Sequence, residues 1–425
     1  MMGFWDLLEN GSVLGRCETN FFHIYVYKDL PNSEFFEYED SLKGTFMHEY
    51  LHYIQFVNTV FGVSYGTIYS NYFSYCGDHF SKNERIEIPL NIRSKEPTLD
   101  SLINKYLKLK GSETCSIEID KIAIEPSDID LAKSEFTSIK VKGINSENGE
   151  SHYFQFGYLS IIENMALIFQ SFFDENLPGH PIVPYHNVEI ILNNLPNPIT
   201  DKKLIFSICL CSLMFSNPAV GFFDVLNVLE VNPSYNGIKL YKHLLLSKIK
   251  HEYCSTLSEL FCYLIDEYQT NIEAAICSEL TYFSKVFENC KSEIRNNECL
   301  LLNLLYETEI NSKESIIALT NYYGLPLIEA NNLTLMPRSP NPDDRDYLDI
   351  ANLRALELVI NRFTSKNRKC PLYEKCSSLL YNDDVIQKFE MSCECLDEQW
   401  KKKEKCLMTA SLRKYELDKK TISQL

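Results

Sequence analysis

Apolar residues recur along most of this chain with the spacing of a helix, and only short runs alternate in the manner of a strand. Residues 20–28 are aromatic and β-branched and predict a strand, which Pro31 ends. The segment from about 41 to 60 predicts a helix. Taken together, the pattern predicts an α+β fold that is predominantly helical, with a small mixed sheet in its N-terminal part.

Residues 82–150 differ from their surroundings, because charges are dense there and the apolar runs are short and alternate. The runs 138–142 and 153–156 flank a polar segment, 145–149, and this arrangement predicts a hairpin. With one helix near 98–109, the region predicts a partly exposed, β-rich insertion. It serves either as structural decoration or as a substrate-binding lid.

Beyond residue 195 the helical pattern is nearly continuous. The sequence Asn-Asn-Leu-Pro-Asn-Pro at 193–198 predicts a boundary, and four prolines between 324 and 345 predict a linker or surface loop. We therefore expect three domains, 1–195, 196–345 and 346–425, the last with a helix at 347–363 and a cysteine-rich C-terminal module. The helices expected after the first boundary cover 203–216, 219–230, 238–249, 255–287, 296–308 and 313–322.

The most informative stretch runs from Gly44 to Gly77, where Glu49 is the only formal charge. In a helix His48 and His52, four residues apart, share one face, and two neutral imidazoles at that spacing can bind one Zn²⁺. Glu49 lies one step around the helix, placed to take a proton from water that the metal activates. A carboxylate in so apolar a run must be paired, neutralised or used. The alternative is a His-Glu-x-x-His pattern that arose by chance in a buried helix.

This motif, on a helix that follows a strand, resembles the zincin metallopeptidases. No His-x-x-Gly-x-x-His continuation follows His52, so the metzincin branch is not matched. The remaining resemblance is to the gluzincins, in which a glutamate on a later helix is the third zinc ligand. It implies Glu163, because Glu163-Asn164-Met165-Ala166 is similar to their second motif. The 110 residues between His52 and Glu163 exceed the spacing of many members, and the charged insertion accounts for them.

Glu163 is favoured as the third ligand because it is the only charge from residue 153 to 173, inside an apolar helical pattern. Glu189 is the alternative, as the only charge between 181 and 200, and the later acids Glu259 and Glu273 stay open. Without a metal, Glu163 would cap a backbone group at the rim of its helix.

The resemblance also implies a Tyr or His opposite the zinc, which stabilises the oxyanion of the tetrahedral intermediate. The candidates are Tyr185 and His186, which follow the Pro/Gly-rich segment 178–184. His180, His152 and Tyr158 stay open for the same role.

The tail carries a second candidate metal site. Four thiols within 37 residues would bind a structural Zn²⁺, or an iron–sulfur cluster, if loops brought them together: Cys370, Cys376, Cys395 and Cys406. The Cys-x5-Cys spacing is looser than a Cys-x2-Cys knuckle, so unliganded cysteines are the alternative.

Charge and cysteine content narrow the class of protein. A net charge of -17 argues against a general nucleic-acid binder, which would need a basic surface. Fifteen scattered cysteines and no visible signal peptide predict reduced thiols in the cytoplasm. The uncharged run 204–223 is long enough to span a bilayer, but Pro218 divides it, which favours two buried helices and no membrane contact.

The expected function is therefore a zinc-dependent peptide-bond hydrolase, with Glu49 as general base and a zincin-like metallopeptidase domain at 1–195. The aminopeptidase branch carries a Gly-x-Met-x-Asn strand that is absent here, so we expect an endopeptidase acting on an intracellular protein substrate, with a regulatory protein partner. One alternative is a catalytically silent zincin-like scaffold, against which the intact Glu49 argues. The other is a regulated protease effector of a toxin or defence system.

Overall fold

A small mixed sheet lies against the helix that carries the histidine motif. Its strand β2 (His23–Val26) is the strand predicted at 20–28. It pairs with β1 (Gly15–Glu18) in antiparallel and with β7 (Leu327–Ala330) in parallel orientation. The short β8 (Thr334–Leu335) pairs antiparallel with β7, so β1 forms one edge of the order β1-β2-β7-β8.

The computed structural model describes residues 15–31, 35–177, 179–331, 334–335, 347–374, 376 and 392–424. Most of the linker predicted at 324–345 lies outside these residues, as does the segment between Cys376 and the later cysteines of the tail.

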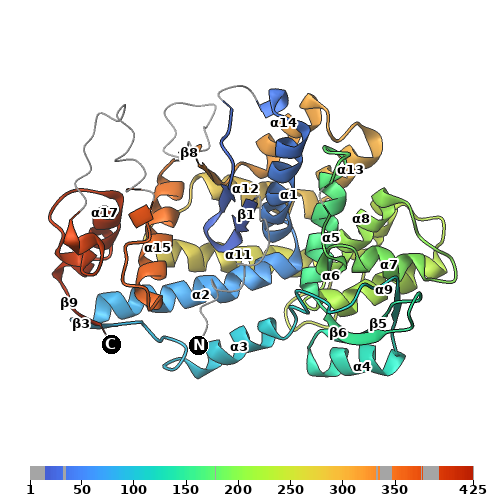
Figure 1. Ribbon diagram of the computed structural model, residues 1–425, viewed down its shortest axis with the longest axis horizontal. Coiled ribbons are helices and arrows are strands. Elements are labelled where there is room, and N and C mark those ends of the chain that lie inside the picture. Colours follow the sequence, from blue (N-terminus) through green and yellow to red (C-terminus); the bar gives the residue numbers. More distant parts are fainter. Residues whose placement is uncertain are drawn as a thin grey trace.

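The predicted motif helix is α1 (Asp40–Val57), and nearly all of its residues after the first turn are buried. A tight corner follows, in which the Thr59 hydroxyl caps α2 (Val60–Lys82) by accepting a hydrogen bond from Gly62 N. A side chain at Gly62 would collide with the carbonyl oxygens of α1's last turn, 2.4 Å away, so only glycine fits there. In Figure 1 α1 stands beside α5 (Tyr158–Gln170), and α2 runs alongside α11 (Leu257–Ile276).

The charged insertion adopts the predicted mixture of strands with a helix. The hairpin expected around residues 145–149 is β5 (Ile139–Ile144) paired with β6 (Ser151–Phe156), and β4 (Lys121–Ala123) extends it. The helix expected at 98–109 is α3 (Pro97–Leu107), and a second helix, α4 (Pro126–Glu135), was not expected. β6 leads directly into α5, so the insertion ends where the second element of the candidate site begins.

Most of the expected later helices are present: α8 (Lys202–Ser212), α9 (Pro218–Val231), α10 (Gly237–Leu245), α13 (Leu300–Glu307) and α14 (Lys313–Tyr323). The single helix predicted at 255–287 is wrong, because α11 ends at Ile276 and α12 (Tyr282–Arg295) starts a new helix. Cys277 adopts a left-handed conformation (φ 52°), and the Asp349 carboxylate accepts hydrogen bonds from the first N–H groups of α12.

The C-terminal part packs back onto the N-terminal part. Figure 1 shows α15 (Tyr347–Thr364) and α17 (Leu407–Lys414) at the end of the molecule opposite the β5–β6 hairpin. The last strand, β9 (Thr421–Gln424), pairs in parallel with β3 (Arg85–Ile88). Strand pairs thus cross both predicted domain boundaries, and the division into three domains stays a prediction. The remaining short elements are η1 (Thr19–Phe21), η2 (Phe35–Glu37), α6 (Ile182–Tyr185), α7 (Asn187–Asn193), η3 (Cys393–Cys395), η4 (Gln399–Lys401) and η5 (Leu417–Lys419).

The described residues thus form an α+β fold that is predominantly helical, with small sheets, as predicted. The uncharged run 204–223 is divided between α8 and α9. Asn217 caps the N-terminus of α9. In the part of the chain that the structure describes, no helix combines the length and the apolar character needed to cross a membrane.

Candidate metal centre

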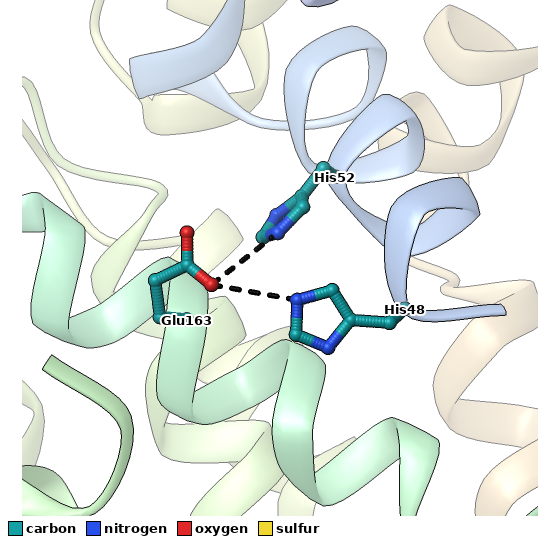
Figure 2. A group of neighbouring side chains, drawn as sticks. All are labelled: His48, His52 and Glu163. Atoms are coloured by element: carbon teal, nitrogen blue, oxygen red, sulfur yellow. Dashed lines mark ion pairs between the residues drawn. The ribbon is translucent and has the colours of Figure 1, made fainter. Parts of the chain in front are cut away.

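The helical spacing of the motif places both imidazoles on the face of α1 that meets α5. The two rings lie edge to face, with centroids 4.9 Å apart. Figure 2 shows both rings directed at the carboxylate of Glu163, which comes from α5. The Nε2 atom of His48 lies 3.4 Å from Glu163 Oε2, and the Nε2 atom of His52 lies 3.6 Å from it.

These three side chains meet the spacing that one metal ion requires, since their ligand atoms all lie within 4.8 Å of one another. Among the described residues, no other group of three His, Cys, Asp or Glu side chains meets it. Two imidazole nitrogens and one carboxylate oxygen are a donor set used by catalytic zinc sites, which leave a further position for water. The side chains are nearly buried, so the cation would sit in a largely dehydrated site.

The other ring nitrogen of each histidine is hydrogen-bonded to a glutamine. His48 Nδ1 lies 3.1 Å from Gln170 Oε1, and His52 Nδ1 lies 2.9 Å from Gln55 Oε1. Each imidazole is therefore fixed at Nδ1 and directs Nε2 at Glu163. Neither glutamine was predicted from the sequence, although Gln55 follows His52 by three residues and Gln170 follows Glu163 by seven. Each therefore shares a helix face with a predicted ligand.

Within the cluster, the Glu163 carboxylate and the His52 imidazole shift one another's pKa values. Burial alone would raise the pKa of Glu163, but His52 and His48 overcome this and hold it far below its usual range. Burial likewise opposes a charge on His52, yet Glu163 and then Glu49 raise its pKa to about 9. A divalent cation would replace the imidazolium as the partner of the Glu163 carboxylate.

Glu49 is adjacent to the cluster but not part of the ligand set. Glu49 is 8% exposed. Strand β1 covers it so closely that a Cβ atom at Gly15 would lie 2.9 Å from Glu49 Oε1. Burial raises the pKa of Glu49, the imidazoles of His48 and His52 lower it, and the net direction is upward. This direction suits a group that exchanges a proton near neutral pH.

The alternative third ligands are engaged elsewhere. Glu189 lies on α7, where its Oε2 is 3.1 Å from Nδ1 of His186. Glu259 accepts a hydrogen bond from the Ser255 N–H, and Glu273 accepts one from the Leu280 N–H. The structure thus brings Glu163, and none of its rivals, to the two histidines.

The side chains suggested for oxyanion stabilisation divide into two groups. The pKa of Tyr185 is raised by the Glu163 carboxylate, by burial and then by Glu49. The Tyr185 hydroxyl therefore interacts electrostatically with both acids of the site. Its ring packs on His180, with centroids 4.6 Å apart, and His180 Nε2 is buried without a hydrogen-bond partner. His186 instead pairs with Glu189. Of the open alternatives, His180 therefore fits beside Tyr185 better than His186 does.

Two further open alternatives lie in other surroundings. His152 is exposed on β6 of the insertion, and the ring of Tyr158 packs on Phe61, with centroids 4.7 Å apart. Nothing in their contacts connects them with the acids of the site.

The four cysteines of the tail lie in one neighbourhood without forming a metal centre of ligand spacing. Cys370 N donates a hydrogen bond to the carbonyl oxygen of Cys395. Burial raises the pKa of the Cys370 thiol to about 11, and the thiols of Cys376, Cys395 and Cys406 add to this rise. The Lys402 ammonium lies 3.1 Å from Cys395 Sγ. No three thiol sulfurs among the described cysteines come within 4.8 Å of one another. A second structural zinc or an iron–sulfur cluster here stays a prediction.

The fold and the site together define a helical α+β protein with a candidate His-His-Glu metal centre between two buried helices. Comparison with known protein families, characterised proteins and solved structures finds no match. The resemblance to the zincins therefore rests on the residues of the site themselves.

Proposed function

We propose that this chain is a zinc-dependent peptide-bond hydrolase whose ligands are His48, His52 and Glu163. The observation that carries the proposal is the convergence of these three ligand atoms within 4.8 Å, with the buried carboxylate of Glu49 on the same helix. Bound Zn²⁺ would polarise a substrate carbonyl and lower the pKa of water towards ~7.

The roles of the protein's own side chains follow from their positions. Glu49 accepts a proton from the attacking water, whose oxygen adds to the carbonyl carbon of the scissile peptide. The same carboxyl then returns the proton to the amide nitrogen as the C–N bond breaks, so the proton count balances and an amine leaves. Tyr185 and His180 supply the hydrogen-bond donors for the negative oxygen that develops on the carbonyl.

The class of substrate is also part of the proposal. The missing Gly-x-Met-x-Asn strand supports an endopeptidase rather than an aminopeptidase. The described cysteines form no disulfide, which supports a cytoplasmic location and an intracellular protein substrate. Cleavage of N-terminally blocked peptides would distinguish an endopeptidase, which accepts them, from an aminopeptidase, which does not.

The test compares wild-type protein with Glu49→Gln, His48→Ala and Glu189→Gln. Zinc content is measured by elemental analysis, and cleavage is followed by labelling the new N-termini that each protein creates in a cell lysate. We expect Glu49→Gln to retain one zinc and lose about 10²–10⁴-fold in cleavage rate. His48→Ala should lose both zinc and cleavage, and Glu189→Gln, the matched control, should lose neither. Wild-type cleavage by Glu49→Gln would refute the mechanism, and a zinc-bound wild type that cleaves nothing would favour the silent scaffold.

A further inference from the structure

Two glutamines join the helices of the metal centre in opposite directions. Gln55 belongs to α1 and bonds both to His52 on its own helix and to α5, where its Nε2 donates to the Ile162 carbonyl oxygen at 3.1 Å. Gln170 belongs to α5 and bonds across to His48 on α1. Both glutamines are buried, with 4% and 5% of their surfaces exposed.

The bond to Ile162 fixes the orientation of the Gln55 amide. A backbone carbonyl only accepts hydrogen bonds, so the atom that faces it must be the NH₂ group of Gln55. The other end, which faces His52, is then the carbonyl oxygen, and this oxygen requires a proton on Nδ1 of His52. The neutral imidazole consequently has its lone pair on Nε2, the atom directed at Glu163.

Gln170 is held close to His48 by the packing of the two helices. A side-chain carbon at Gly44 of α1 would lie 3.2 Å from Gln170 Cγ and 3.0 Å from the side chain of Asp174, so the glycine lets α1 approach α5 at this level. Gln170 follows Glu163 by seven positions, about two helical turns, which places both side chains on the face of α5 that meets α1.

We propose that Gln55 and Gln170 are the positioning residues of the metal centre, and that they orient both imidazoles without adding charge. This inference rests on the proposed function. Hydrogen-bond partners on the outer nitrogen of a ligating histidine fix its tautomer and contribute to metal affinity. An amide oxygen does this as a neutral group, whereas a carboxylate would add a negative charge. With Glu163 as the only anionic ligand, a bound Zn²⁺ keeps a net positive charge and with it the power to polarise a carbonyl.

The two glutamines differ in what a replacement must preserve. At position 170 the bond that matters is the one that the side-chain oxygen accepts from His48, and a glutamate supplies an equivalent oxygen. At position 55 the side chain must accept from His52 and also donate to Ile162, and a glutamate loses the donor and faces a carbonyl oxygen. The conservative change should therefore restore metal binding at 170 but only in part at 55.

The test measures the Zn²⁺ affinity of the full-length protein by competition with a chromogenic chelator, and the absorption of bound Co²⁺ as a report on ligand geometry. We expect Gln55→Leu and Gln170→Leu each to weaken Zn²⁺ binding about 10–100-fold and to alter the Co²⁺ spectrum. Gln170→Glu should bind Zn²⁺ within about threefold of wild type, and Gln55→Glu should fall between Gln55→Leu and wild type. Gln269→Leu, which removes a partly buried glutamine from α11, is the matched control and should leave the affinity unchanged.

Thermal unfolding of the metal-free proteins separates positioning from general stability, because a purely structural role would lower the unfolding temperature without changing Zn²⁺ affinity. If Gln55→Leu does not fold, the comparison of Gln170→Leu with Gln170→Glu decides alone. Wild-type affinity in the leucine variants that fold would overturn the inference while leaving the metal centre intact. The proposed function and the inference both fail if the wild-type protein binds no Zn²⁺, or if the Zn²⁺ that it binds is retained by His48→Ala.

Discussion

Strand β1 passes directly over the proposed general base, and this contact can be perturbed with a single methyl group. Gly15 is the first residue of β1 and pairs with Val26 of β2. A Cβ atom at Gly15 would lie 2.7 Å from Glu49 Cγ and 2.9 Å from Glu49 Oε1. The substitution Gly15→Ala therefore acts on the Glu49 side chain from outside α1, because the three atoms nearest to the added methyl all belong to Glu49.

The size of the effect follows from these distances. An ordinary van der Waals contact begins at 3.4 Å, so the methyl carbon that Gly15→Ala adds is about 0.7 Å too close to Glu49 Cγ. The strand resists displacement because β1 pairs with β2 along its whole length, so Glu49 must give way. A misplacement of about 1 Å in a reacting group costs up to about 10²-fold in rate, and we expect Gly15→Ala to lower kcat about 10–100-fold.

The assay uses a peptide that wild-type protein cleaves and Glu49→Gln does not, together with zinc analysis. Gly15→Ala should keep one zinc and wild-type Zn²⁺ affinity while kcat falls. Gly77→Ala is the matched control, because nothing lies within 4 Å of a Cβ at that position in α2, and it should keep the wild-type rate. Combined with Glu49→Gln, Gly15→Ala should cause no further loss. A wild-type kcat for Gly15→Ala would refute the placement of Glu49 as the base against β1.

Three further predictions concern groups outside the metal centre. Burial raises the pKa of Glu293 to about 7, so the folded chain holds a proton at Glu293 that the unfolded chain releases above pH 4.5. This group alone should lower stability by about 3 kcal/mol between pH 4.5 and 7, so urea titrations should show this extra fall in wild type relative to Glu293→Gln, and parallel pH profiles would contradict the assignment. Burial opposes ionisation of Cys395, but Lys402 lowers the pKa of this thiol, so iodoacetamide should modify Cys395 before Cys370 at pH 8. Lys402→Met should slow the modification of Cys395, and equal rates in wild type and Lys402→Met would contradict the pairing. Asp349→Ala leaves the first N–H groups of α12 without their acceptor and should lower the unfolding free energy by about 2 kcal/mol. Asp349→Asn should lie between Asp349→Ala and wild type, and an unchanged unfolding midpoint in Asp349→Ala would count against this cap.

Features that depend on neighbouring residues could be predicted from the sequence. The β5–β6 hairpin follows from alternating apolar residues on both sides of a polar turn, and the register pairs Ile144 with Ser151 around it. The common face of His48 and His52 follows from the period of the helix. In both cases the interacting groups are close in the chain, so local geometry determines their contact.

Features that depend on distant segments could not be predicted. The pairing of β2 with β7 joins His23 to Leu327, and that of β3 with β9 joins Arg85 to Thr421. Strands of four residues carry no signal that selects one partner among several. The end of α11 could not be predicted either. Cys277, which follows the helix, adopts a left-handed conformation although it is neither the glycine nor the asparagine that usually does so at a helix end.

The choice between Glu163 and Glu189 shows which additional information the sequence held. Both are the only charge in an apolar stretch, so isolation alone does not separate them. Glu189 has His186 three residues before it, one helical turn away, and the structure shows the two side chains paired. The positions three and four residues from Glu163 hold Leu, Ser, Ala and Leu, none of which can neutralise a carboxylate. A largely buried acid without a local partner needs a distant one, and for Glu163 the distant partners are the two imidazoles of α1.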